Sequence, residues 1–266
     1  MVNILIESPI NYMGSKYKLL PQLIPLFPKN KSHFVDLFTG GGSVYINVNH
    51  LYEKVLANDI ITDLIEIHKF LQDKDFLQEA KEYSIKTKSS KEEYLTLREQ
   101  YNKTHNPAML LALIWSCNSN MMRFNNDFIF NQTWGKRCFN KNTQKKWNKY
   151  SEKDYSNVIF RNMDFYELGM KVKDNAFVYL DCPYKNTEAG YNSFWSNKNE
   201  DDLIKLIHHY IKNDIKFGLS GVNNGKPNKV YDIISKEDIK VYKFGDLYQK
   251  ISKKDKINVE YYITNI

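Results

Sequence analysis

The sequence predicts an α/β fold in which a mostly parallel, Rossmann-like sheet is interrupted by an inserted, mostly helical segment. An apolar run at His33–Phe38 leads into the turn Thr39–Gly42 and a helical pattern, and a second apolar run, Val55–Ala57, ends at an acid. This strand–turn–helix–strand order is typical of nucleotide-binding sheets. Polar helical patterns and a loop then occupy residues 67–151, after which strand patterns alternate with helices again. That alternation favours parallel strands.

Each remaining element follows from its own pattern. Short apolar runs bounded by turn residues predict further strands at Asn157–Phe160, Ala176–Leu180, Ile215–Leu219, Ile239–Val241 and Glu260–Thr264. Helical spacing of apolar residues predicts helices at Ser15–Leu26, Lys69–Ser84, Lys91–Lys103, Ala108–Cys117 and Asn199–Lys212. The stretch Asn118–Asn148 is rich in Asn and aromatic residues and is predicted to be a loop. Residues 1–66 and 152–266 are therefore expected to form the sheet domain, and residues 67–151 an inserted domain.

Composition narrows the class of protein. Of the 266 residues, 42% are hydrophobic, which suits one large or two modest globular domains. No apolar run is long enough to span a bilayer, and the N-terminal stretch lacks the features of a signal peptide, so a cytoplasmic protein is expected. Cys117, Cys138 and Cys182 lack metal-ligand spacing, and His208-His209 has no acidic or cysteine companions. Neither group predicts a disulfide or a metal site.

The charge of the chain is basic. A formal net charge of +7 makes an anionic partner such as DNA plausible. The Lys- and Asn-rich composition of an AT-rich genome would explain the same charge equally well. The basic residues include only four arginines: Arg98, Arg123, Arg137 and Arg161. Where lysine is the default cation, a retained arginine suggests a site that uses the planar guanidinium fork.

The segment Phe34–Gly42 places an acid and three glycines at the end of a predicted strand. Glycines let the backbone approach a ligand closely, and ligands bind at this edge of open α/β sheets. The segment lacks GxGxxG spacing and no basic residue follows to hold a phosphate, so an uncharged adenosyl group fits better than a dinucleotide or ATP. Asp36 is expected to contact the methionine part of such a ligand. A plain glycine-rich turn is the alternative.

Asp59 follows the next predicted strand, about 20 residues beyond the glycines, where an acid holds ribose hydroxyls in nucleoside-binding folds. A carboxylate suits this task because it can accept hydrogen bonds from two adjacent hydroxyls at once. The alternative role is an N-cap for the helix that follows, since Asp is a favoured N-cap residue.

The segment Phe177–Tyr184 is an apolar strand that ends in Asp181, Cys182, Pro183 and Tyr184. An acid, a proline-fixed turn and an aromatic ring in this order can hold an exocyclic amino group. Asp181 and a backbone carbonyl of the turn would each accept one hydrogen, and Tyr184 would stack on the base that carries the amino group. An Asx-type turn after a core strand is the alternative for this motif alone.

Together these motifs, in this order and spacing, resemble the Dam-type DNA adenine-N6 methyltransferases of the D12 class, most of all those of T-even bacteriophages. The resemblance covers essentially the whole chain. The segments that carry it are Ile10–Lys16, Phe34–Gly42, Leu56–Ile60, Lys91–Lys103, Ser119–Asn125, Trp134–Arg137, Asp181–Tyr184, Tyr191–Trp195 and Lys216–Ser220.

The resemblance implies a Rossmann-like methyltransferase sheet, S-adenosylmethionine as cofactor and double-stranded DNA as partner, with no metal and no membrane. It implies that Tyr12, Lys16, Asp59 and Asp181 contact the cofactor, with Lys16 reaching the methionine carboxylate. The full set of expected cofactor-binding residues is Tyr12, Lys16, Asp36, Phe38, Gly40, Asp59, Asp164 and Asp181.

The inserted residues 67–151 are expected, on the same resemblance, to form the DNA target-recognition domain. The expected DNA-binding residues are Met121, Arg123, Asn125, Lys136 and Arg137. Arg123 and Arg137 fall in the predicted loop of this region, and arginine is the usual bidentate reader of guanine. The family's usual target, GATC, is the expected site of methylation of a flipped-out adenine.

One departure from the family pattern concerns the catalytic motif. The family has Asp-Pro-Pro-Tyr, whereas this chain has Cys182 in place of the first proline. If that position acts through its backbone carbonyl, the side chain can vary, so we do not expect Cys182 to be a nucleophile. Two other functions stay open: cytosine-N4 methylation, since the same turn can hold either amino group, and a non-catalytic DNA-binding relative.

Overall fold

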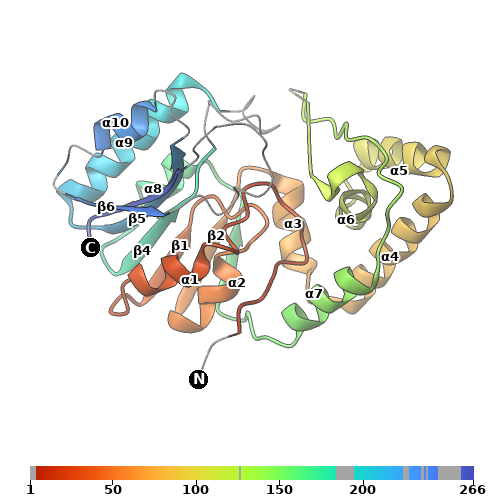
Figure 1. The fold of residues 1–266 in the computed structure, drawn as a ribbon, viewed down its shortest axis with the longest axis horizontal. Helices are drawn as coiled ribbons and strands as arrows, with labels where there is room; N and C mark the ends of the chain where they lie inside the picture. The colour runs from red at the N-terminus through yellow and green to blue at the C-terminus, as the bar shows by residue number, and fades with distance from the viewer. Residues whose placement is uncertain are drawn as a thin grey trace.

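The computed structural model describes residues 4–125, 127–183, 195–223, 228–234, 237, 239–244 and 259–266. Within them the chain forms a seven-stranded sheet in the order β3-β2-β1-β4-β5-β7-β6 (Figure 1). The strands are β1 His33–Asp36, β2 Lys54–Asn58, β3 Val158–Arg161, β4 Ala176–Leu180, β5 Lys216–Asn223, β6 Lys240–Phe244 and β7 Val259–Thr264. Strands β1 to β5 pair in parallel, and β7 runs antiparallel to β5 and β6. The predicted Rossmann-like α/β sheet is confirmed.

Both faces of the sheet are covered, so its central strands are apolar on both sides. In β4, Phe177 and Tyr179 join one hydrophobic cluster, whereas Val178 and Leu180 join the other. This alternation follows from the two-residue period of a strand. The covering helices are α1 Leu20–Leu23, α2 Tyr45–Val48, α8 Phe165–Gly169, α9 Asn197–Lys212 and α10 Lys229–Ile234, with short 3-10 turns at Ile24–Leu26 and Asn49–Leu51.

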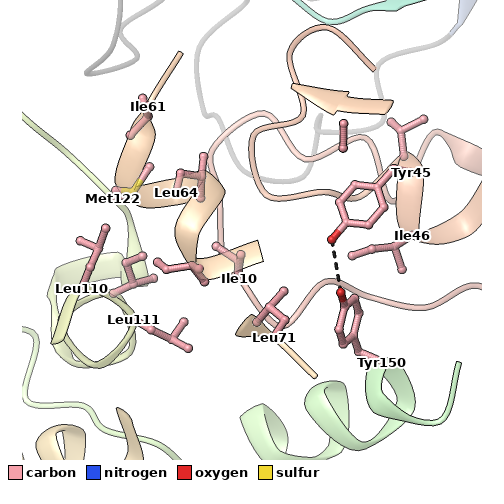
Figure 2. Packing of buried hydrophobic residues seen from close by; sticks show 14 of the residues in the cluster. Ile10, Tyr45, Ile46, Ile61, Leu64, Leu71, Leu110, Leu111, Met122 and Tyr150 are labelled. Carbon is pink, nitrogen blue, oxygen red and sulfur yellow. Dashed lines mark hydrogen bonds between the residues drawn. The ribbon is translucent and has the colours of Figure 1, made fainter. Parts of the chain in front are cut away.

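The remaining helices form a group beside the sheet (Figure 1): α3 Thr62–Phe70, α4 Lys74–Ser89, α5 Lys91–Thr104, α6 Pro107–Ser116 and α7 Lys141–Ser151. Helix α6 lies at the centre of this group, because its sequence is apolar on all sides and nearly all its residues are buried. Figure 2 shows Leu64 of α3 close to Leu110 and Leu111 of α6, so one continuous core joins the helical group to the sheet side. In the described residues, no helix is both long enough and apolar enough to span a membrane.

The prediction of a loop over Asn118–Asn148 was partly wrong, because its last quarter belongs to helix α7. The Asn140 side chain caps this helix by accepting hydrogen bonds from the backbone N–H groups of the first turn. Thr143, Trp147 and Tyr150 lie four and three residues apart and form its buried face. Lysine and asparagine occupy the positions between them and obscure this spacing in the sequence.

Two predicted helix bounds were also wrong. The helix expected at Ser15–Leu26 begins only at Leu20, since the Lys16 backbone N–H instead donates to the Ser43 hydroxyl beside the glycine turn. The helix expected at Lys69–Ser84 is two helices, α3 and α4. Helix α4 begins directly after Asp73, because the Asp73 carboxylate caps it by accepting the N–H groups of its first turn.

Candidate functional site

Three acids meet at the carboxyl edge of the sheet. Strand β1 pairs with β2 on one side and with β4 on the other, so the strand order reverses beside β1. Ligands bind at such a switch point in open α/β sheets. Asp36 ends β1, Asp59 follows β2 and Asp181 follows β4. The negative charges of Asp181 and Asp59 contribute to a raised pKa of the Asp36 carboxyl, which places the three groups within electrostatic reach of one another.

Asp36 is a buried acid with unmet hydrogen-bonding capacity. Its side chain is 1% exposed, and neither carboxylate oxygen has a hydrogen-bond partner among the described residues. Burial is the main cause of the strongly raised pKa of its carboxyl, ahead of the nearby acids. The backbone N–H groups of Phe38 and Tyr45 oppose this rise without completing a hydrogen bond. An unpartnered buried acid of this kind is a candidate for ligand binding.

The glycine turn is held in a conformation that requires glycine. Gly40 and Gly42 have φ of +49° and +80°, in the left-handed region that glycine adopts readily. A Cβ on Gly40 would lie 2.9 Å from the Tyr12 ring, so Tyr12 packs closely on the turn. Two expected cofactor-binding residues, Tyr12 and Gly40, are therefore neighbours although 28 positions separate them.

Asp59 braces this turn. One carboxylate oxygen accepts the Gly40 backbone N–H at 2.9 Å, and the other accepts the Ile61 N–H at 3.0 Å. The N-cap of α3 is Ile61, so the helix-cap alternative for Asp59 is wrong. Burial raises the pKa of the Asp59 carboxyl, and these backbone hydrogen bonds oppose the rise. Each carboxylate oxygen has a second lone pair, so the acid retains the capacity to accept ribose hydroxyls.

Asp181 forms a partly buried ion pair with Lys16. The Lys16 Nζ lies 2.6 Å from a carboxylate oxygen, and the two side chains are only 7% and 18% exposed. Lys16 also donates to the Gly14 carbonyl at 3.1 Å. Burial raises the pKa of the Asp181 carboxyl, while the Lys16 charge lowers it. Lys16 therefore favours the ionised, hydrogen-bond-accepting form of Asp181. The expected contact of Lys16 with a ligand carboxylate stays a prediction.

The turn after β4 places Cys182 in the core. The Cys182 side chain is buried in the core beside Leu180 and Trp195, and burial, aided by the Asp181 charge, raises the pKa of its thiol. A buried thiol of this kind is a poor nucleophile. Pro183 is half-buried, and Tyr184 lies outside the described residues.

Phe38 and Tyr12 pack against different hydrophobic clusters, on opposite faces of the sheet. The Phe38 ring packs against Phe165 at 5.1 Å and Trp195 at 5.8 Å between ring centroids. Asp164 caps α8 by accepting the backbone N–H groups of its first turn, at 2.9 and 3.2 Å. The structure thus gives Asp164 a helix-capping role, and its expected cofactor contact stays a prediction.

Two residues that hold the glycine turn were not predicted from the sequence. The Ser8 hydroxyl donates to the Gly41 carbonyl at 2.5 Å, and the His68 ring bonds the Gly40 carbonyl at 2.8 Å. Both lie on elements remote from the turn in sequence. No local pattern identifies such residues, because the contact exists only once the chain has folded.

The expected DNA-binding residues lie along the segment between α6 and α7. Arg123 and Arg137 are exposed; Arg123 Nε donates to Asn131 at 3.0 Å, and an Arg137 Nη donates to Asn120 at 3.2 Å. Asn125 accepts the backbone N–H groups of Asp127 and Ile129 and so shapes a turn. The remaining two lie nearby: Met121 is half-buried, and the Lys136 ammonium sits 5.9 Å from the Trp134 ring centroid.

The fold and the acidic sheet edge define a nucleoside-binding α/β protein. Residues 12–252 match the model of the D12 class N6 adenine-specific DNA methyltransferases, and the chain belongs to this family. It is 33% identical to modification methylase StsI of Streptococcus sanguinis over 85% of this chain, and 34% identical to type II methyltransferase M.FokI of Planomicrobium okeanokoites over 84%. The chain spans only 37% of the length of each of these two relatives.

A third relative is closer in length. The DNA adenine methylase of Escherichia coli K12 is 25% identical, with 75% of this chain and 72% of that protein covered. Among solved structures, an rRNA methyltransferase, aviRa from Streptomyces viridochromogenes, aligns with 93% of this chain and 83% of its own at a TM-score of 0.39 and 11% identity. A structural similarity this low does not indicate function.

Proposed function

We propose that this chain is a site-specific DNA adenine-N6 methyltransferase that uses S-adenosylmethionine. The observation that carries the proposal is the meeting of Asp36, Asp59 and Asp181 at the switch point of the sheet, in a member of this family. Residues 1–66 and 152–266 would bind the cofactor and perform the reaction. Residues 67–151 would recognise the DNA.

The residues at the sheet edge fit a cationic, nucleoside-containing cofactor. Asp36 is buried and receives no hydrogen bond from the described residues, and the methionine ammonium of the cofactor would supply a donor. Asp59 would accept the ribose hydroxyls, and Tyr12 would line the glycine turn against which the cofactor lies. When bound, S-adenosylmethionine supplies a methyl group made electrophilic by the positive charge on its sulfur.

Asp181 would hold the amino group of the target base. Its carboxylate and the Cys182 carbonyl would each accept one amino hydrogen, which draws the nitrogen toward tetrahedral geometry and frees its lone pair. Lys16 opposes the rise in the pKa of Asp181 that burial causes, and so favours its ionised form, and their ion pair orients the carboxylate. Because an amino group inside a duplex is out of reach, the adenine would have to be flipped out of the helix. Catalysis would then rest on positioning and electrostatics.

Specificity would come from the segment between α6 and α7. We propose GATC as the site, with Arg123 and Arg137 as the candidates for reading guanine. Their exposed side chains on one segment, each held by an asparagine, support this assignment.

The test is to incubate duplex DNA with the protein and methyl-labelled S-adenosylmethionine, digest the DNA and identify the labelled nucleoside. We expect N6-methyladenine, lost when every GATC is removed from the substrate. Label in N4-methylcytosine would support the cytosine alternative. Absence of label despite DNA binding would support the non-catalytic alternative.

A further inference from the structure

A chain of buried hydrogen bonds connects the glycine turn to helix α7. His68 Nε2 bonds the Gly40 carbonyl at 2.8 Å, and His68 Nδ1 lies 3.0 Å from the Tyr45 hydroxyl. The Tyr45 hydroxyl in turn lies 3.4 Å from that of Tyr150, as the dashed line in Figure 2 shows. The side chains of His68, Tyr45 and Tyr150 are each at most 1% exposed. The chain thus runs from the turn through α3 and α2 to α7.

The direction of each bond follows from the chemistry of its ends. A carbonyl only accepts, so His68 Nε2 must carry the proton that Gly40 receives. Burial lowers the pKa of His68 to about 4, so the ring is neutral and its Nδ1 accepts. The Tyr45 hydroxyl therefore donates to Nδ1, and its oxygen accepts from the Tyr150 hydroxyl. Phe160 stacks on the His68 ring at 5.7 Å and fixes its plane.

Hydrogen bonds hold both the N–H and the carbonyl of Gly40. Asp59 accepts the Gly40 N–H, and His68 donates to the Gly40 carbonyl. At φ of +49° the backbone of Gly40 is otherwise free to leave the left-handed region at little cost. The two bonds together therefore select the conformation that the turn presents at the sheet edge.

We propose that His68, Tyr45 and Tyr150 form a positioning relay through which helix α7 of the helical group sets the conformation of the glycine turn and so the affinity for the cofactor. None of the three is proposed to touch the reacting atoms. The inference rests on the proposed function, because it takes the glycine turn as part of the S-adenosylmethionine site.

The test removes single hydroxyl groups and measures S-adenosylmethionine binding by calorimetry. Tyr45→Phe should weaken binding about tenfold and Tyr150→Phe about threefold, as expected for the loss of one buried hydrogen bond. Tyr155→Phe is the matched control. Its ring stacks on Tyr150 at 4.4 Å, but its buried hydroxyl has no hydrogen-bond partner among the described residues, so affinity should stay within a factor of about two.

Two further measurements separate positioning from general damage. At saturating cofactor the kcat of Tyr45→Phe should equal that of wild type, and Tyr150→Phe should add nothing in a Tyr45→Phe background, because the relay is already broken. Wild-type affinity in both single variants overturns the relay. Equal weakening by Tyr155→Phe overturns it as well. Failure of the wild-type protein to bind the cofactor would instead contradict the proposed function.

Discussion

Asp36 is maintained at a position where an acid destabilises the fold. It is buried, two other acids lie within electrostatic reach, and its carboxylate has no hydrogen-bond partner in the part of the chain that the structure describes. An uncompensated buried charge of this kind opposes folding, and such residues concentrate at functional sites. Lys16 forms an ion pair with Asp181 at the same sheet edge, and we propose that Asp36 and Asp59 bind the cationic cofactor there.

Replacement Asp36→Asn should therefore separate stability from binding. The amide keeps the shape and removes the charge, so the free energy of unfolding at pH 7 should rise, while S-adenosylmethionine affinity should fall by at least about tenfold. Urea unfolding and calorimetric titration measure the two effects. A less stable variant that binds the cofactor as well as wild type would show that Asp36 is a structural residue.

Cys182 is expected to act through its backbone alone. Cys182→Ala should lose about 1 kcal/mol of stability, because a buried side chain is truncated, yet retain methyl transfer within a few-fold of wild type. Cys182→Pro restores the family turn and should be equally or more active. A folded Cys182→Ala protein without activity would show that the thiol takes part in the reaction.

In the segment between α6 and α7, Arg123 and Arg137 are each held by a hydrogen bond while their side chains are exposed. Arg123 donates to Asn131 through Nε. Its two Nη groups therefore remain for a bidentate hydrogen bond to guanine. Arg137 donates to Asn120 through one Nη, which leaves its Nε and its other Nη for a pair of the same kind. Both arginines are therefore candidates for base-reading residues.

Arg123→Ala should remove about 1–3 kcal/mol of discrimination at one base pair and accept degenerate sites. Arg161→Ala, which removes an exposed arginine from β3, is the charge-matched control and should leave the preference unchanged. Methylation rates on GATC and on all its single-base variants measure the effect. Uniform weakening on every sequence, with a salt slope smaller by about one, would make Arg123 a phosphate contact.

For the molecule as a whole, the sequence predicted the strands and helices better than the contacts between residues far apart in the chain. The strands were found because central parallel strands are apolar on both faces, as Phe177 and Val178 illustrate. The positions of Asp36 and Asp59 at the sheet edge could be predicted because Asp36 ends one strand and Asp59 follows the next. The Lys16–Asp181 pair and the His68 bond join residues far apart in the chain, and α7 was missed because its buried residues lie among lysines.

The most direct test of the methyltransferase site is the rate of methyl transfer by Asp181→Ala, measured in a single turnover with DNA binding measured in parallel. We expect the rate to fall at least about 100-fold while DNA affinity is retained, because the variant loses the acceptor for the target amino group. Asp174→Ala, an exposed acid just before the opposite end of β4, should leave the rate unchanged. An Asp181→Ala protein that methylates DNA at nearly the wild-type rate would contradict the account.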